Sequence, residues 1–206
     1  MIVVVDYGVN NLRSVVRALD AGGHPASLSS DPAVVRAADR VVVPGVGNFG
    51  QAVPNLQRSG LGDAILEVAS AGRPLLGICL GQQLFFSASE EAPGTVGLGL
   101  LPGKVVRFRT ELLVPHVGWA EVTATSAGRR HPVLGPLFAE GPQFYYHVHS
   151  YHPAQTGAAV ELATGDYGGI FTTAVGKDNI LGVQFHPEKS QQAGIRLLAA
   201  FAEWTP

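Results

Sequence analysis

The chain has 206 residues, of which 46% are hydrophobic and 15% charged, so it can bury one sizeable core and is expected to form a single domain over residues 1–206. A formal net charge of −2 and the lack of a basic tract give no electrostatic reason to expect nucleic acid or an anionic membrane as a partner. No run approaches the roughly 20 apolar residues of a membrane helix, and residues 1–6 lack a basic leader, so we expect the chain to be cytoplasmic.

The first part of the chain predicts strands that alternate with helices. The β-branched runs at residues 2–5 and 40–43 show no polar alternation, which is typical of parallel strands buried on both faces. Between them, apolar residues recur at helical spacing from Leu12 to Leu19. Asp31-Pro32 then supplies a helix N-cap followed by proline at the first helical position.

The same alternation continues up to about residue 90. A helix is expected over residues 65–71, then a strand at residues 74–76 and a helix at residues 82–86. This order predicts an α/β fold, a Rossmann-like parallel sheet with covering helices, in which ligands gather at the carboxyl ends of the strands. Residues 87–103 are rich in glycine and acidic side chains and are expected to form a loop.

The second half predicts a different arrangement, because six strand candidates follow one another closely. Such spacing is typical of a mixed or antiparallel part of a sheet. The candidates are residues 105–108, 121–125, 144–148, 158–163, 170–174 and 180–184. The final segment, residues 191–204, carries apolar residues at helical spacing and is expected to pack back on the sheet.

Cys79 lies in the run Gly77-Ile78-Cys79-Leu80-Gly81, between an expected strand and an expected helix. This pattern is typical of a nucleophile elbow, a strained turn that needs glycine on both sides of the nucleophile. The chain has a single cysteine, which excludes a disulfide within the chain and a cysteine-based zinc cluster. A buried structural cysteine is the alternative. The glycine pair and the distant segment His186-Pro187-Glu188 favour a nucleophile.

A catalytic thiol needs a base, and the chain offers seven histidines. Only His186 is followed two residues later by a carboxylate, Glu188, at the expected end of a strand. An imidazole can take the thiol proton, and a carboxylate can fix the tautomer of that imidazole. We therefore predict a triad of Cys79, His186 and Glu188.

The segment Pro44-Gly45-Val46-Gly47 follows the second buried strand and is therefore expected beside Cys79 at the same edge of the sheet. Its amides would face a developing oxyanion, with the amide of Leu80 as a second donor, so Val46 and Leu80 are the oxyanion candidates. An ordinary tight turn is the alternative, since paired glycines are common in turns.

Other side chains near these segments have simpler expected roles. The histidines between residues 147 and 152 lack a nearby carboxylate or cysteine, so we expect hydrogen-bonding groups and neither a metal nor another cofactor. The aromatic residues Trp119, Tyr145 and Tyr146 are expected in the core or at its rim. If they are exposed together, they would indicate a protein interface.

Several segments beyond the elbow belong to a recognisable pattern. They are Asp6-Tyr7-Gly8 with Asn11-Leu12-Arg13-Ser14-Val15, Pro44-Gly45-Val46-Gly47-Asn48-Phe49, Pro115-His116-Val117-Gly118-Trp119, His149-Ser150-Tyr151 and Gly182-Val183-Gln184-Phe185-His186-Pro187-Glu188-Lys189-Ser190. Over nearly its whole length the chain resembles the class I, triad-type glutamine amidotransferases, and within them the glutaminase subunits of imidazole glycerol phosphate synthase.

The resemblance implies a three-layer, flavodoxin-like fold and a glutaminase that serves histidine biosynthesis. In such an enzyme Cys79 attacks the side-chain amide of glutamine, and His186 protonates the departing ammonia. Water then releases glutamate from the thioester, while Glu188 holds His186.

The resemblance also implies a binding pocket for the amino-acid part of glutamine. Gln83 and Glu91 would grip this part, and the backbone of Gly47, Ser150 and Tyr151 would complete the pocket. A carboxylate that faces the ammonium group of the substrate is physically sensible.

A partner is implied as well, because in the family the ammonia passes to a cyclase subunit with a (βα)8-barrel fold, in a heterodimer. The positions that lie towards that partner are Asn11, Trp119, Tyr146 and Lys189. The family pattern further implies a resting state in which the loop at residues 44–47 points its amide away, until nucleotide on the partner turns it inward.

Two positions depart from the family pattern. Ala120 stands where asparagine normally follows Gly-Trp, and Asn10 stands where glycine normally precedes Asn-Leu. Both departures affect the expected coupling to the partner more than the triad.

Three alternatives stay open. The chain could be the glutaminase component of anthranilate, aminodeoxychorismate or pyridoxal phosphate synthesis. It could be a regulatory scaffold without activity, against which the complete triad argues. It could also be a stand-alone cysteine hydrolase, which would be fully active without any partner.

Overall fold

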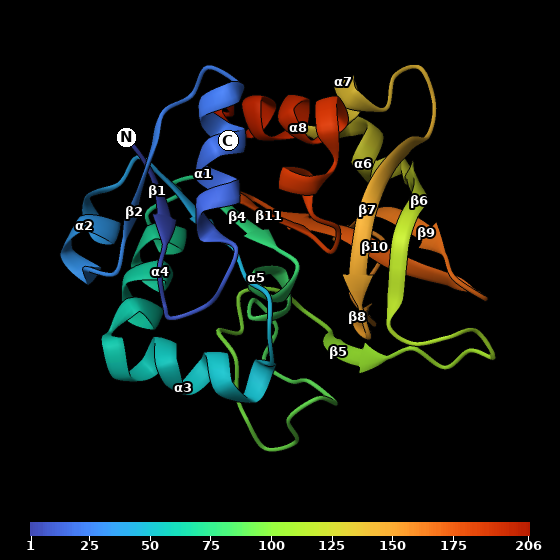
Figure 1. Cartoon of the computed structure of the whole chain (residues 1–206), viewed down its shortest axis with the longest axis horizontal. Coiled ribbons are helices and arrows are strands. Elements are labelled where there is room, and N and C mark those ends of the chain that lie inside the picture. Colours follow the sequence, from blue (N-terminus) through green and yellow to red (C-terminus); the bar gives the residue numbers. More distant parts are fainter.

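A nine-stranded sheet forms the centre of the computed structural model, which describes all 206 residues (Figure 1). Five neighbouring strands are parallel: β2 (Ala26–Ser29), β1 (Ile2–Val5), β3 (Arg40–Val43), β4 (Leu75–Ile78) and β11 (Ile180–Val183). Four antiparallel strands extend the sheet beyond β11: β10 (Ile170–Lys177), β9 (Glu161–Asp166), β6 (His116–Ala124) and β7 (Gln143–His149). The expected mostly parallel sheet with an antiparallel C-terminal part is confirmed.

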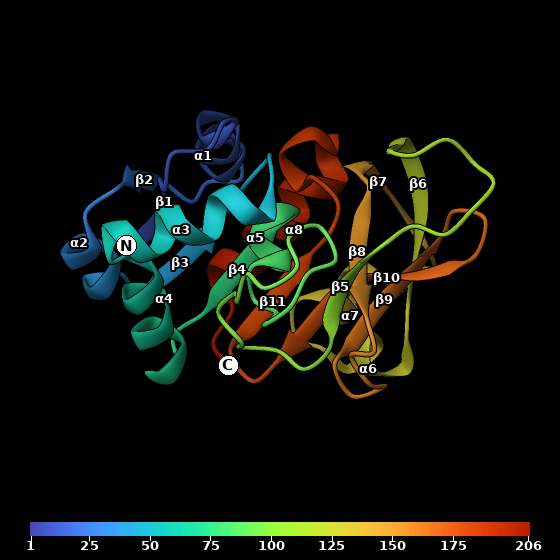
Figure 2. The same cartoon turned by 90° about the horizontal axis from the view of Figure 1, so that it is seen from below.

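Helices cover both faces of the sheet, as the two views show together (Figure 1, Figure 2). One face carries α1 (Leu12–Ala21) and α8 (Gln191–Glu203), which contact each other. The opposite face carries α2 (Pro32–Ala37), α3 (Phe49–Ser59) and α4 (Leu61–Ser70). The result is the expected three-layer α/β architecture.

The strand β1 shows why its sequence lacks polar alternation. Successive side chains of a strand point to opposite faces of a sheet. Val3 and Val5 join the core under α2, α3 and α4, whereas Val4 joins the core under α1 and α8. All three side chains are therefore buried, in two separate hydrophobic cores.

The remaining elements are short. They are the helices α5 (Leu80–Gln83), α6 (Ser126–Arg130) and α7 (Leu134–Leu137), the 3-10 helix η1 (Pro187–Lys189), and the strands β5 (Lys104–Arg107) and β8 (Tyr151–Ala154), which pair as a separate two-stranded sheet. No helix of the chain has the length and apolar character needed to cross a membrane.

The helix signals at the N-terminal end of the sequence are confirmed. The buried residues of α1 include Leu12, Val15 and Leu19, as the spacing predicted. At the start of α2, the Asp31 side chain accepts a hydrogen bond of 2.8 Å from the amide of Ala33 and so acts as the predicted N-cap.

Several predicted boundaries are wrong. The helix expected at residues 82–86 is α5, which begins directly after Cys79, and the helix expected from residue 65 begins at Leu61. The strand expected from residue 158 begins at Glu161, because a turn precedes it in which the amide of Val160 donates to the carbonyl of Gly157.

Other elements were predicted only in part or not at all. β6 begins at His116 and not at residue 121, since its first residues pair with β7, a strand far along the chain. β2 was not predicted, because its four residues are only partly buried and show no apolar run. α3 was not predicted either, and its helical pattern is interrupted by Pro54.

Candidate active site

Cys79 occupies the turn between β4 and α5, with φ of 51° and ψ of −108°. A side chain in this conformation is strained. A Cβ atom on Gly81 would overlap the carbonyl oxygen of Val43, and one on Gly77 would lie 2.7 Å from the backbone nitrogen of Gln82. The turn therefore requires glycine on both sides of the cysteine, as the elbow pattern predicted.

His186 and Glu188 follow the end of β11, the strand that pairs with β4. Their side chains are buried, and the Nδ1 atom of His186 lies 2.7 Å from Oε1 of Glu188. The Nε2 atom of His186 is also buried and has no hydrogen-bond partner within the chain. One ring nitrogen is thus held by the carboxylate, and the other is free for proton transfer.

The charge state of His186 depends on its neighbours. Burial alone would lower the pKa of this imidazole, but Cys79 and Glu188 outweigh that effect and raise the pKa to about 10. A neighbouring negative charge favours the protonated imidazole. The arrangement therefore favours the protonated form of His186, which can give its proton to a leaving group.

Asn11 was expected towards a partner, and the structure shows where its side chain lies. Its Nδ2 atom donates a hydrogen bond of 2.7 Å to Oε1 of Glu188, the same oxygen that faces His186. Asn11 immediately precedes α1 and has a positive φ of 70°. It therefore supports the carboxylate of the triad, a contact that sequence reasoning missed.

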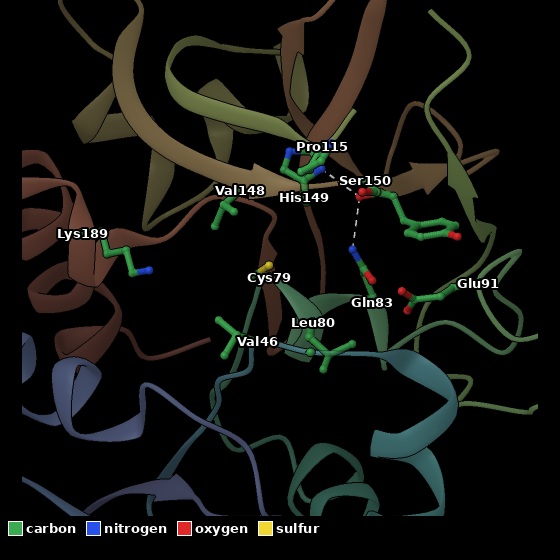
Figure 3. A pocket seen from close by; sticks show the side chains of 12 residues that line it. Val46, Cys79, Leu80, Gln83, Glu91, Pro115, Val148, His149, Ser150 and Lys189 are labelled. Atoms are coloured by element: carbon green, nitrogen blue, oxygen red, sulfur yellow. Dashed lines mark hydrogen bonds between the residues drawn. The ribbon is translucent and has the colours of Figure 1, made fainter. Parts of the chain in front are cut away.

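Cys79 opens into a cavity of about 440 Å³. In Figure 3 the thiol lies at the centre, with Gln83 and Glu91 on one side and Lys189 on the other. The predicted residues that line the cavity are Val46, Gly47, Cys79, Leu80, Gln83, Glu91, Ser150, Tyr151 and Lys189. Three lining residues that were not predicted are Pro115, Val148 and His149.

The two amino-acid-binding candidates are already held by backbone groups. Glu91 accepts a hydrogen bond of 2.7 Å from the amide of Phe49 at the start of α3. Gln83 donates a hydrogen bond of 3.1 Å to the carbonyl of Tyr151. Both side chains are therefore oriented before any ligand arrives.

The loop at residues 44–47 faces the elbow, and its conformation leaves one oxyanion candidate, the amide of Leu80, unavailable. The amide of Leu80 donates to the carbonyl oxygen of Gly45 at 3.3 Å. The preceding carbonyl, of Pro44, accepts a hydrogen bond of 2.6 Å from the buried hydroxyl of Tyr7. Leu80 therefore cannot stabilise an oxyanion until the Gly45 carbonyl turns away, and its catalytic role stays a prediction.

Trp119 of β6 is exposed near the cavity and Tyr146 of β7 is half-buried beside it, whereas Tyr145 is buried in the core, as expected. Trp119 is 47% exposed and meets Tyr146 in an edge-to-face contact, while the ammonium group of Lys189 lies 5.8 Å from the centre of the Tyr146 ring. Two apolar neighbours on the same strands, Val117 and Phe144, are 56% and 55% exposed. This apolar surface reaches the cavity, because Val148 pairs with Val117 and lines the cavity itself.

The histidines of β7 form hydrogen bonds, as expected, and His147 and His149 do so inside the protein. Both are buried, because they point into the antiparallel part of the sheet among other rings. His147 forms hydrogen bonds of 3.1 Å with the Tyr145 carbonyl and 3.0 Å with the Thr173 hydroxyl. No group of three or more histidine, cysteine or acidic side chains converges on a point where a metal ion would fit.

Gln184 is a further residue of the site that sequence reasoning did not single out. It is fully buried one residue beyond β11, and its Nε2 atom lies 3.6 Å from the sulfur of Cys79. The sequence carries it inside the segment that ends in His186-Pro187-Glu188, and its distance of two residues from His186 was the available signal.

Comparison with known proteins agrees with this geometry. The family model for "Glutamine amidotransferase class-I" matches residues 3–203. The chain is 44% identical to the imidazole glycerol phosphate synthase subunit HisH of Syntrophotalea carbinolica, over 98% of this chain and 100% of that protein. It is 46% identical to the protein of the same name from Moorella thermoacetica, over 98% and 94% of the two chains.

A solved structure supports the fold independently. One described as a glutamine amidotransferase superposes with a TM-score of 0.75 at 19% identity, covering 97% of this chain and 98% of the other. At that identity the likeness establishes the fold alone. The family assignment follows from the match over residues 3–203 and from the full-length relatives: this chain belongs to the class I glutamine amidotransferases and, within them, to the HisH subunits of imidazole glycerol phosphate synthase.

Proposed function

We propose that this chain is the glutaminase subunit of imidazole glycerol phosphate synthase and releases ammonia from glutamine through Cys79, His186 and Glu188. The observation that carries the proposal is the pair of His186 and Glu188, buried and 2.7 Å apart, beside the single cysteine on its strained elbow. In this reaction the protein itself supplies the nucleophile, the acid and the base.

The first half of the reaction consumes glutamine. The thiol proton passes to Nε2 of His186, and the thiolate attacks the side-chain amide carbon. The carbon–nitrogen bond then breaks, and the imidazolium gives its proton to the departing nitrogen, so that ammonia and a thioester result. A raised pKa of about 10 keeps His186 protonated until that step needs the proton.

The second half restores the enzyme. Neutral His186 takes a proton from water, the resulting hydroxide attacks the thioester, and glutamate leaves as the thiolate returns. Glu188 stabilises the imidazolium in both halves, and Asn11 holds that carboxylate in place.

Glutamine itself would bind with its amino-acid part away from the thiol. Glu91 supplies the negative charge for the substrate ammonium group, and Gln83 supplies hydrogen bonding beside it. Gly47, Ser150 and Tyr151 line the same cavity and contribute backbone groups, as the family resemblance implied. The cavity volume of about 440 Å³ is ample for one amino acid.

The oxyanion that forms on the amide would need the loop at residues 44–47 in another conformation. Once the Gly45 carbonyl releases the amide of Leu80, that amide and the one of Val46 can both donate to the oxyanion. One such donor is worth about a hundredfold to a thousandfold in rate. We therefore propose that the loop conformation described above is the resting, poorly active state.

The partner would be the cyclase subunit, for which we propose a (βα)8-barrel fold in a heterodimer. The curated relatives carry the word subunit in their names. The exposed surface of Trp119, Tyr146 and Lys189 borders the catalytic cavity, which suits a partner that receives ammonia directly. The cytoplasmic location expected from the sequence stays a prediction.

The test is glutamate release from glutamine by the chain alone, with the cyclase subunit, and with the cyclase subunit plus its nucleotide ligand. Strong release only in the complete mixture is expected. Equal release in every mixture would instead indicate a stand-alone amidase. No glutamate release in any mixture would indicate that the chain works with the partner of another pathway or is a scaffold without activity.

A further inference from the structure

Gln184 makes a contact with the nucleophile that the triad does not explain. Its side chain is fully buried behind Cys79, and its Nε2 atom lies 3.6 Å from the sulfur. Its backbone amide is fixed by a hydrogen bond of 2.8 Å to the carbonyl of Thr173. The contact therefore comes from a rigid strand end and not from a surface side chain.

The hydrogen-bond network decides which atom of Gln184 faces the sulfur. An amide side chain can present either its oxygen or its nitrogen, and the partners determine which one. The carbonyl of Tyr151 can only accept, so Gln83 must present its Nε2 atom there, at 3.1 Å. The second hydrogen on that nitrogen points 3.1 Å to Gln184, which must therefore present Oε1 to Gln83.

The Nε2 atom of Gln184 therefore faces the sulfur of Cys79. The carbonyl of Tyr151 on β8 can only accept, so it fixes the orientation of Gln83, and Gln83 in turn fixes that of Gln184. This series of hydrogen bonds ends in an N–H group that points at the sulfur. Hydrogen bonds to a charged acceptor are stronger than those between neutral groups. The N–H group therefore favours the thiolate over the thiol.

We propose that Gln184 is a catalytic residue that donates a hydrogen bond to the sulfur of Cys79 and stabilises its thiolate form. The inference rests on the proposed role of Cys79 as the nucleophile. When the thiolate attacks, the sulfur–carbon bond forms and the negative charge moves to the amide oxygen of the substrate. The sulfur of the thioester is neutral, so the hydrogen bond weakens at that stage and doesn't trap the product.

The single cysteine of the chain makes a direct test possible, because every alkylation event reports on Cys79. The rate of reaction with iodoacetamide is measured on the full chain from about pH 5 to pH 10, and its midpoint gives the pKa of the thiol. In Gln184→Leu the midpoint is expected to rise by about one pH unit, because a hydrogen bond to a charged group is lost. Alkylation near neutral pH should fall by up to about tenfold.

Gln82 offers a matched control. It is also a fully buried glutamine, and neither atom of its amide has a hydrogen-bond partner within the chain. Gln82→Leu removes the same number of atoms without touching a donor to the sulfur, so its alkylation midpoint is expected to match that of the unmodified chain. A general effect of losing a buried glutamine would shift both variants alike and would overturn the proposal.

A second variant covers the case in which Gln184→Leu fails to fold. Gln184→Glu keeps the shape of the side chain but replaces the donor with a carboxylate, so the midpoint should rise at least as much. An unchanged midpoint in whichever variant folds would refute the role of Gln184.

The measurement needs neither glutamine nor a partner. Two results together would separate the two proposals. A shifted midpoint in Gln184→Leu would support the hydrogen bond to the sulfur, while full glutaminase activity in Cys79→Ala would disprove the proposed function.

Discussion

The two sides of the catalytic cavity differ in whether their conformation already suits catalysis. On the elbow side, the strained turn, the paired His186 and Glu188 and the glutamine network are all assembled without a ligand. On the loop side, the Gly45 carbonyl takes the amide of Leu80 that an oxyanion would need. We therefore expect that transition-state stabilisation, and not the nucleophile, limits this glutaminase while the loop keeps this conformation.

The largest expected effect on activity comes from removing the nucleophile on the elbow side. Cys79→Ala should lower glutamine-dependent activity by roughly 10⁴-fold or more, since no other group can form the thioester. In complex with the cyclase, turnover with added ammonium salts should stay intact, because only ammonia generation needs the thiol. The two activities are compared in the same preparation, and loss of both would contradict the assignment of Cys79.

The next effect concerns the turn that presents the thiol. Gly81→Ala would force a Cβ atom into the carbonyl oxygen of Val43, which belongs to the neighbouring strand β3. We expect a loss of about 3 kcal/mol in the free energy of unfolding, together with loss of activity. Urea unfolding measures the first and glutamate release the second.

Gly62 provides the control for that variant. It lies in α4, and an added Cβ atom there meets its nearest atoms at 3.6 Å or more. Gly62→Ala should therefore stabilise the chain by up to about 1 kcal/mol, because alanine favours a helix. Equal stability of the two variants would show that the elbow isn't tightly constrained.

An effect of intermediate size is expected on the pH dependence of stability, and it comes from the buried histidines of β7. Burial, with a smaller contribution from His116, lowers the pKa of His147 from 6.5 to about 3. Burial likewise holds the pKa of His149 well below its ordinary value. Below about pH 6.5 the unfolded chain binds protons that the folded chain does not, so stability falls as the pH falls.

Each buried histidine should contribute a loss of about 1.4 kcal/mol per pH unit between about pH 6.5 and its folded pKa. The measurement is the free energy of unfolding in urea at several pH values from about 7.5 to 5. His147→Asn should show a shallower dependence than the unmodified chain. The same slope in both would mean that His147 is protonated in the folded state.

Sequence reasoning predicted which residues lie together on the elbow side, because the signals for them are local, while their catalytic roles stay predictions. The glycines around Cys79 and the two-residue spacing of His186 and Glu188 lie within short segments whose geometry a strand end imposes. The three-layer fold followed from buried β-branched runs such as Val3 to Val5, in which alternate side chains enter two different cores.

The rest depends on contacts between distant parts of the chain. Gln184 contacts Cys79 across 105 residues, and Asn11 contacts Glu188 across 177. The spacing of Gln184 from His186 was a weak local signal, and neither contact could be identified without the fold that brings the two segments together. The partner of the Leu80 amide is set by one peptide orientation in a loop. Such an orientation depends on small energy differences that the residue types do not determine.

The smallest effect on activity that we predict tests the loop side directly. Tyr7 donates to the Pro44 carbonyl at 2.6 Å, and its hydroxyl fills the space where a Cβ atom on Gly45 would lie. Tyr7→Phe removes that hydrogen bond and should make the resting loop less stable relative to the active one. A neutral hydrogen bond contributes about 1 kcal/mol, so glutamate release by the chain without partner should rise about fivefold.

Tyr145→Phe is the matched control, since Tyr145 is another buried tyrosine, on β7, whose ring stacks on Phe185. It should leave unpartnered glutamate release unchanged. In the complete mixture with cyclase and nucleotide, Tyr7→Phe should differ little from the unmodified chain, because the loop has already turned there. Tyr7→Phe could instead lower the fully activated rate and leave the rate without partner unchanged. The hydroxyl would then stabilise the active conformation of the loop. In that case only the hydrogen bond between the Gly45 carbonyl and the Leu80 amide would stabilise the resting conformation.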